Sequence, residues 1–358
     1  MINVTKTWLP DKKKYIKYLD KIYSNAWITN NGPFVQELEE RLADYLGVKN
    51  IILVSNGTIG LEIAYRVLGI KNYAITTPFS FVATTSSLVA NGINPIFVDI
   101  DQETFLINHK NIEESITPHT EAVVPVHVFG NACDIDSIEE IAKKYNLKVI
   151  YDAAHAFGVK YKGKNILNYG DISVLSFHAT KLFHTIEGGA LIINNDELVQ
   201  KARCFINFGI ENPESIPTLG INAKMNEFEA AMGLCVLDDI DIILEKRRLV
   251  YENYEKSLKD ILQLQRKNPN ATLNYSYFSV VFESEEKLKQ VRRALNDQNV
   301  FPRRYFYPSL DTLNYIEPKQ HCPISRNISS RILSLPLYPD LDMNDQKRII
   351  EIIKEQIG

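Results

Sequence analysis

The chain has 358 residues, of which 45% are apolar and 23% charged, a composition typical of a globular protein with a large core and a second, smaller domain. Its formal net charge of -4 and the lack of a lysine- and arginine-rich block argue against a nucleic-acid partner or a membrane surface. No apolar run approaches the ~20 residues of a membrane span, no apolar secretory segment opens the chain, and the four cysteines are widely spaced, so we expect a cytoplasmic protein with reduced thiols.

Short apolar runs alternate with helical patterns between residues 50 and 195. The expected strands are Ile51–Ser55, Tyr73–Thr76, Pro95–Asp99, Ala122–Val126, Lys148–Asp152, Ile172–Ser176 and Gly189–Asn194. The expected helices are Pro33–Leu46, Gly57–Leu68, Phe81–Asn91, Ile135–Tyr145 and Asp196–Phe208. Continuous apolar strands with helical crossovers predict an α/β fold whose mostly parallel seven-stranded sheet has helices on both faces.

The pattern changes after a long helical stretch over Met225–Leu258. A strand is expected near Tyr275–Phe282, and helices near Glu286–Asn296 and Asn344–Ile357. We therefore predict a large domain over residues 1–245 and a smaller C-terminal α+β domain over residues 246–358. The first ~25 residues are candidates to pack on the smaller domain.

The stretch that begins at Ser176 carries the clearest chemical signal. Lys181 lies among Phe177 and Leu182 and not on a polar helix face. Apolar surroundings disfavour the charged form of a lysine, so its free amine becomes a nucleophile for Schiff-base formation with a carbonyl substrate or with pyridoxal phosphate. Taken alone, the residue is better explained as a lysine that covers a strand end with its stem and keeps its amine in water, and it is the other motifs that favour the nucleophile.

Two further segments place polar groups where strands end. Gly57 and Thr58 open a helix after the first strand, where free N–H groups and the helix dipole favour an anion such as phosphate. Asp152 ends the fifth strand, at the sheet edge where open α/β folds bind ligands. An acid there can keep the ring nitrogen of pyridoxal phosphate protonated, which makes the ring an electron sink. Helix capping is the alternative for each segment.

Phe81 and His155 are the other candidates for contacts with a flat cofactor. Phe81 follows the second strand and could stack on a ring or pack in the core. His155 could bond the phenolic oxygen of the cofactor or steady Asp152. No metal site is expected, because the histidines, including His178 and His184, lack the spacing of metal ligands.

The segment Gly158–Lys164 partly matches a P-loop, but Asn165 stands where Ser or Thr is required. We expect a hairpin over Val159–Ile166 instead. No GxGxxG follows a strand, which argues against a dinucleotide-dependent oxidoreductase.

Taken in order, these motifs resemble the sugar-nucleotide aminotransferases of the DegT/DnrJ/StrS type, which are fold-type I enzymes dependent on pyridoxal phosphate. The segments that carry the resemblance are Ser55–Thr58, Thr77–Phe81, Asp152–His155, Ser176–Lys181, Glu187–Gly189, Asn222–Met225, Arg303–Pro308 and Leu335–Leu337. Each motif is weak alone, and the ordered set is specific.

The resemblance implies a role for each candidate. Lys181 would form the Schiff base with the cofactor and move the proton between substrate and cofactor carbons. Asp152 would pair with the pyridinium nitrogen, His155 would lie near the phenolic oxygen, and Phe81 would stack on the ring. The residues that would hold the phosphate are Gly57, Thr58, Ser176 and, from the other subunit of a homodimer, Asn222. No role follows for His184.

The resemblance also implies a ping-pong reaction in which L-glutamate gives its amine to the cofactor and a keto-sugar nucleotide then receives it. Candidates for binding the sugar nucleotide are Asn31, Arg304 and Tyr307. Arg303 is a further candidate for its diphosphate, and ordinary surface charge is the alternative for the arginine pair.

The segments Arg303–Leu310 and Cys322–Ser325 most resemble enzymes that aminate the C4 keto group of a dTDP-4-keto-6-deoxyhexose. The expected product is dTDP-4-amino-4,6-dideoxy-D-glucose, for a surface polysaccharide such as O-antigen. A 3-keto sugar, a UDP- or GDP-sugar, and a regulator that binds pyridoxal phosphate without turnover remain open.

Overall fold

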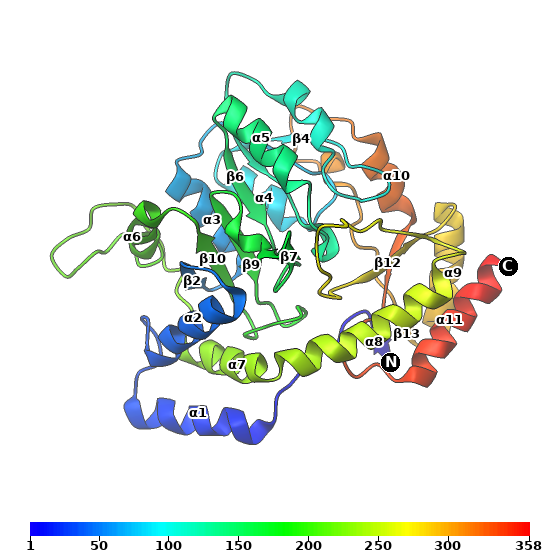
Figure 1. Ribbon diagram of the computed structural model, residues 1–358, viewed down its shortest axis with the longest axis horizontal. Coiled ribbons are helices and arrows are strands. Elements are labelled where there is room, and N and C mark those ends of the chain that lie inside the picture. Colours follow the sequence, from blue (N-terminus) through cyan, green and yellow to red (C-terminus); the bar gives the residue numbers. More distant parts are fainter.

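The computed structural model describes every residue from Met1 to Gly358. Its centre is a seven-stranded sheet in the order β2-β10-β9-β6-β5-β3-β4 (Figure 1). The strands are β2 (Ile51–Val54), β3 (Tyr73–Thr76), β4 (Asn94–Phe97), β5 (Thr120–Val124), β6 (Lys148–Asp152), β9 (Ile172–Ser176) and β10 (Gly189–Ile193). Only β10 runs antiparallel to its neighbours. The expected mostly parallel α/β fold is confirmed.

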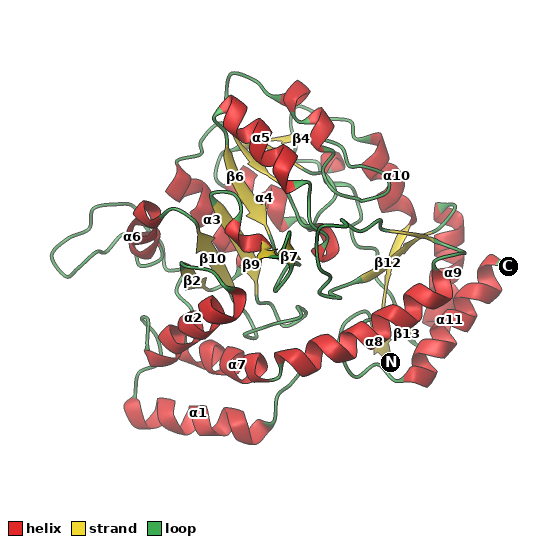
Figure 2. Cartoon of the chain, viewed as in Figure 1, coloured by secondary structure: helices red, strands yellow, loops and turns green.

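Helices cover both faces of this sheet (Figure 2). The helices of the whole chain, not all of which lie on this sheet, are α1 (Lys12–Asn25), α2 (Pro33–Leu46), α3 (Gly57–Leu68), α4 (Ala83–Ala90), α5 (Ile135–Tyr145), α6 (Asp196–Phe205), α7 (Glu227–Asp238), α8 (Ile240–Leu258), α9 (Glu285–Asp297), α10 (Pro323–Arg331) and α11 (Met343–Ile357). Alternate side chains of a strand point to opposite faces. Ile52 and Val54 therefore pack with α3 and α6, whereas Ile51 and Leu53 pack with α2, α5 and α7.

Three expected helices have different bounds in the structure, and the one expected over Asp196–Phe208 ends at Phe205. The prediction of one long helix over Met225–Leu258 is wrong, because the structure has two helices, α7 and α8, which meet at Asp239 (φ −100°, ψ 4°). The carboxylate of Asp239 accepts hydrogen bonds from Trp8 Nε1 at 3.1 Å and Lys14 Nζ at 2.9 Å, which fixes the break. Helix α4 begins at Ala83, so Phe81 lies in the loop after β3.

A smaller core forms around an antiparallel sheet of β11 (Gln263–Leu264), β12 (Phe278–Val281) and β14 (Ile332–Leu335), with α9 and α11. Helix α8 runs from the large core to this smaller one (Figure 1). Ile243 belongs to the large core and Tyr254 to the smaller one. The domain boundary near residue 245 remains a prediction, and it falls inside this helix.

The N-terminal residues contact both cores. Strand β1 (Ile2–Asn3) pairs in parallel with β13 (Val300–Phe301), and Ile2 is buried in the smaller core. Helix α1 instead lies along α7 (Figure 1), where Tyr15 Oη donates to the carbonyl of Phe228 at 3.1 Å.

A buried carboxylate holds the start of α2. Glu227 is fully buried and accepts the backbone N–H groups of Phe34 and Val35, each at 2.9 Å. These donors have no partner within the helix, and the helix dipole favours a negative charge there. A Cβ on Gly32 would lie 2.5 Å from Glu227 Cδ, so the preceding position requires glycine. The Trp27–Asn31 loop is thereby fixed at its end.

The segment that partly matches a P-loop is a hairpin, as expected. Strands β7 (Lys160–Tyr161) and β8 (Lys164–Asn165) pair antiparallel. Elsewhere, no helix is both long and apolar enough to cross a membrane. The four cysteines are buried and unpaired, and no three potential metal ligands gather in one place.

Candidate active site

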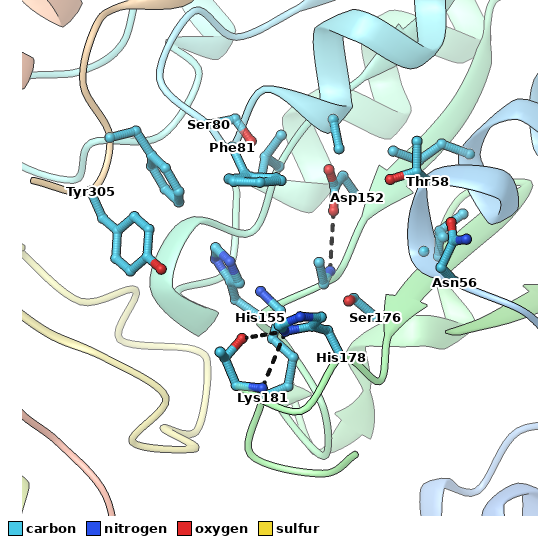
Figure 3. A pocket seen from close by; sticks show the side chains of 18 of the residues that line it. Asn56, Thr58, Ser80, Phe81, Asp152, His155, Ser176, His178, Lys181 and Tyr305 are labelled. Carbon is cyan, nitrogen blue, oxygen red and sulfur yellow. Dashed lines mark hydrogen bonds between the residues drawn. The ribbon is translucent and has the colours of Figure 1, made fainter. Parts of the chain in front are cut away.

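A cavity of about 250 Å³ lies at the carboxyl ends of the central strands. The predicted residues that line it are Gly57, Thr58, Phe81, Asp152, His155, Ser176 and Lys181. They meet there because the carboxyl ends of parallel strands share one edge of a sheet. In Figure 3, Asp152, Ser176 and Lys181 surround the cavity, and Phe81 lies on a different side of it from Lys181.

Asp152 is the buried acid of this cavity. Its carboxylate accepts hydrogen bonds from Thr84 Oγ1 at 2.7 Å and from the N–H of Ala154 at 3.2 Å. Thr84 Oγ1 also lies 2.8 Å from Ser80 Oγ. Burial raises the pKa of Asp152, although these bonds and the charge of Lys181 act in the opposite direction. A cation next to the carboxylate would stabilise its charged form.

His155 lies in a cluster of aromatic rings that includes Phe129 and Phe306. Its ring is parallel to that of Phe306, with centroids 5.7 Å apart, and its Nδ1 accepts the N–H of Phe129 at 3.3 Å. Burial, with a contribution from the charge of Lys181, holds the pKa of His155 well below its ordinary value. A neutral ring that accepts at Nδ1 carries its proton on Nε2, which is then the nitrogen that can donate.

Lys181 lies in the loop that joins β9 to β10. The loop packs on an aromatic cluster, in which Phe183 stacks on Phe157 at 4.8 Å and meets Phe177 edge-on at 4.8 Å. Lys181 Nζ lies 3.4 Å from Tyr277 Oη, across a sequence separation of 96 residues. The amine is therefore held by the segment that leads into β12.

The first turn of α3 forms one end of the cavity. Asn56 caps the helix through Oδ1, which accepts the N–H of Ile59 at 2.9 Å. The N–H groups of Gly57 and Thr58 have no partner within the helix. A Cβ on Gly57 would lie 3.0 Å from Ser176 Cβ, so glycine allows β9 to approach and brings the Ser176 hydroxyl to the same end. These donors suit a phosphate at a helix N-terminus.

Four predicted residues lie outside this cavity. Asn222 is exposed, and its Oδ1 accepts Lys224 Nζ at 2.9 Å. Asn31 lines a separate hollow, together with Lys224. Arg304 donates to Glu285 Oε1 at 3.0 Å, and its guanidinium lies 3.5 Å from the centre of the Tyr307 ring. The predicted residues that do not line the cavity are therefore Asn31, Asn222, Arg304 and Tyr307.

The sequence offered both Arg303 and Arg304 for the diphosphate, and the structure places only one of them at the cavity. Arg303, not Arg304, lines the cavity, with its guanidinium 4.7 Å from the centre of the Tyr305 ring. Tyr277 and Phe306 also line it. No local pattern could have identified them, because they reach Lys181 only through the fold. The sequence carries a weak signal for Thr84, because its hydroxyl lies four residues after that of Ser80 in a helical pattern, which places the two on one face.

Asp152→Asn should stabilise the protein without its cofactor. The pKa of Asp152 is higher in the folded chain than in the unfolded one, so its ionisation costs stability as the pH rises. The melting temperature should increase at pH 8, and the gain should shrink toward the unfolded-state pKa of about 3.9. In the loaded enzyme, turnover should fall about 10- to 100-fold, since a charge-assisted hydrogen bond is lost.

Asp136→Asn is the matched control. The hydrogen bond from Lys162 lowers the pKa of the Asp136 carboxyl, so this change should slightly lower the melting temperature at pH 8. An unchanged or lower melting temperature for Asp152→Asn at pH 8 would contradict the role of burial.

The comparisons with known proteins agree with this geometry. The model of the DegT/DnrJ/EryC1/StrS aminotransferase family matches residues 10–354. The dTDP-4-amino-4,6-dideoxy-D-glucose transaminase of Shigella dysenteriae is 45% identical over 361 residues, covering 99% of this chain and 98% of that relative. The crystal structure of DesI in the presence of its TDP-sugar product has a TM-score of 0.94 at 30% identity, covering 99% of this chain and 92% of that one. NtdA from Bacillus subtilis with bound cofactor PMP has a TM-score of 0.90 at 28% identity, covering 96% and 81%.

The residues of the cavity fit pyridoxal phosphate, whose amine form is PMP. The start of α3 suits the phosphate, the buried Asp152 suits a cationic ring nitrogen, and Lys181 supplies an amine for the aldehyde. The cofactor of the enzyme is therefore pyridoxal phosphate. Fold, cavity and sequence together show that the chain belongs to the DegT/DnrJ/EryC1/StrS aminotransferase family and is a pyridoxal-phosphate-dependent aminotransferase.

Proposed function

We propose that this chain transfers the amino group of L-glutamate to the C4 keto group of dTDP-4-keto-6-deoxyglucose. The product is dTDP-4-amino-4,6-dideoxy-D-glucose, made in the cytoplasm for a surface polysaccharide such as O-antigen. The observation that carries the proposal is the 45% identity, over nearly the whole of both chains, to a transaminase named for that product. Replacing the C4 amine of the product by a keto oxygen gives the proposed substrate.

The proposed roles follow from the positions of the side chains. When bound, pyridoxal phosphate withdraws electrons from the amino-bearing carbon of the donor and makes its proton acidic. Lys181 Nζ takes this proton and later delivers one to C4 of the sugar, with Tyr277 Oη at 3.4 Å to orient it. Asp152 would keep the ring nitrogen charged, His155 Nε2 would donate to the phenolic oxygen, and Phe81, which is 49% exposed, would cover the ring face.

Arg303 is the proposed anchor for the diphosphate. Its guanidinium lines the cavity, where it can form two parallel hydrogen bonds to phosphate oxygens. Arg304 is a weaker candidate than the sequence suggested, because Glu285 and the carbonyl of Ser330 already bind its guanidinium. Asn31 and Tyr307 are exposed and remain candidates for contacts with the nucleotide.

The active site is proposed to be shared in a homodimer. The segment between α6 and α7 protrudes from the molecule (Figure 1). Three apolar side chains on it are largely exposed, namely Phe208 at 52%, Ile216 at 68% and Leu219 at 73%. Exposed apolar groups on a protruding segment are typical of a subunit interface. Asn222, which does not line the cavity of its own chain, would then reach the phosphate bound by the second subunit.

The absorbance of the cofactor tests the proposed reaction. Adding L-glutamate should bleach the band of the lysine-bound cofactor, and dTDP-4-keto-6-deoxyglucose should restore it. Lys181→Ala should retain cofactor and lose turnover, because the base is gone. UDP- and GDP-linked 4-keto sugars and a 3-keto sugar are the matched controls.

Each outcome of this experiment has a distinct meaning. Bleaching that only another sugar nucleotide reverses would overturn the dTDP assignment and keep the aminotransferase. A band that never bleaches would exclude L-glutamate as donor and favour a protein that binds the cofactor without turnover. Full activity of Lys181→Ala would remove the proposed base.

Arg303→Gln should raise KM for the sugar nucleotide about 10- to 100-fold, the effect of one lost charge-assisted contact. Binding of pyridoxal phosphate should stay unchanged. Arg304→Gln is the control: it should lower the melting temperature through loss of its contact with Glu285 and leave KM nearly unchanged. A raised KM in Arg304→Gln with an unchanged KM in Arg303→Gln would instead identify Arg304 as the residue that binds the diphosphate.

Asn222→Ala should weaken retention of pyridoxal phosphate, measured by dialysis and absorbance. The loss should appear only under conditions where the protein is dimeric by sedimentation. Mixed dimers with Lys181→Ala chains would show which chain supplies each residue. Unchanged retention in the Asn222→Ala dimer would rule out the shared phosphate site.

A further inference from the structure

His184 is a buried histidine to which the proposed reaction gives no part. It lies three residues after Lys181 and is 1% exposed. Its Nδ1 accepts the N–H of Ile186 at 3.2 Å, so its proton lies on Nε2, which is 2.6 Å from the carbonyl oxygen of Trp8 and donates to it. Both ring nitrogens are therefore engaged, and the neutral form of the ring is the one that satisfies both bonds.

The first of these bonds holds a strained residue. Ile186 has a φ of 75°, in the left-handed region that a β-branched residue rarely adopts. Its side chain is 44% exposed, so apolar burial does little to hold it there. Hydrogen bonds fix the turn on both sides, since Thr185 Oγ1 donates to the carbonyl of Glu187 at 2.6 Å. Glu187 and Lys181 both line the active-site cavity.

The second bond connects this loop to the N-terminal segment. Trp8 is itself fixed by the hydrogen bond from its Nε1 to Asp239. Closer to the N-terminus, β1 pairs with β13, and the carbonyl of Val4 accepts the N–H of Leu337 at 3.1 Å. Strand β13 leads directly into Arg303, which lines the same cavity as Lys181. The segment Ile2–Trp8 thus ties Arg303 to the Lys181 loop.

We infer that His184 is a positioning residue for the aminotransferase reaction. Its ring holds the strained turn at Ile186, and through that turn it sets Lys181 and Glu187 relative to the N-terminal segment. His184 does not line the cavity, so it acts through the loop and not on the substrate. Strain of this kind persists only where the surrounding contacts enforce it, and it is often found at active sites.

Four variants test this inference. His184→Phe keeps a planar ring and removes both bonds. His184→Gln keeps one acceptor and one donor, and so can restore them. Trp8→Phe keeps the backbone carbonyl that His184 binds and an aromatic ring near Lys246, and it loses the hydrogen bond to Asp239. Ile186→Gly removes the strain, because glycine adopts a positive φ without a steric cost.

The first measurement is amide hydrogen exchange over residues 182–188 in the protein without cofactor. Exchange should be about tenfold faster in His184→Phe, the size of one lost hydrogen bond, and close to wild type in Trp8→Phe. The second measurement is the single-turnover rate with L-glutamate. It should fall about tenfold in His184→Phe, stay within about threefold of wild type in His184→Gln, and recover in the His184→Phe/Ile186→Gly double variant.

Exchange and turnover within about twofold of wild type in His184→Phe would overturn the inference. A second combination of results would also overturn it: turnover in His184→Gln no faster than in His184→Phe, together with no recovery in the His184→Phe/Ile186→Gly double variant. His184 would then only fill space. If His184→Phe fails to fold, His184→Gln and the double variant decide the question. The turnover measurement rests on the proposed amino donor. If the wild-type enzyme does not react with L-glutamate, that donor is rejected, and the hydrogen-exchange measurement still tests the role of His184.

Discussion

The buried carboxylate of Asp152 is the constraint on which the active site depends. Ionising this group at the end of a central strand is unfavourable, and two hydrogen bonds do not fully offset the burial. A cationic ring nitrogen removes the imbalance. Binding of pyridoxal phosphate should therefore stabilise the fold at a buried carboxylate whose burial the protein alone does not fully offset.

Lys181 must be held as firmly as Asp152, and the contacts that hold it are of a different kind. Its loop packs on Phe157, Phe177 and Phe183, which supply apolar burial, while His184 supplies directed bonds to the N-terminal segment. Burial fixes where the loop lies, and the hydrogen bonds fix the conformation of its turn. Packing alone would leave the strained φ of Ile186 without support.

Two of the predicted site residues lie outside the cavity of their own chain. Asn222 and Asn31 face solvent, near exposed apolar side chains such as Phe208, and Glu227 ties their two segments together. A carboxylate that binds the first turn of α2 makes the Trp27–Asn31 loop and the Asn222 segment one unit. This arrangement explains why a second subunit, if it docks here as proposed, would meet a preformed surface.

The sequence by itself determined the sheet, its helices and the residues that end its strands, because those signals are local. Apolar runs mark the strands, and the ends of parallel strands must meet at one edge, so Gly57 and Asp152 could be grouped without a structure, and the family resemblance added Ser176. Only the tertiary structure decided between Arg303 and Arg304, brought Tyr277 to Lys181, and broke the expected long helix at Asp239. Those outcomes depend on partners far away in the chain, such as Glu285 and Trp8, and no local pattern encodes the distance between them.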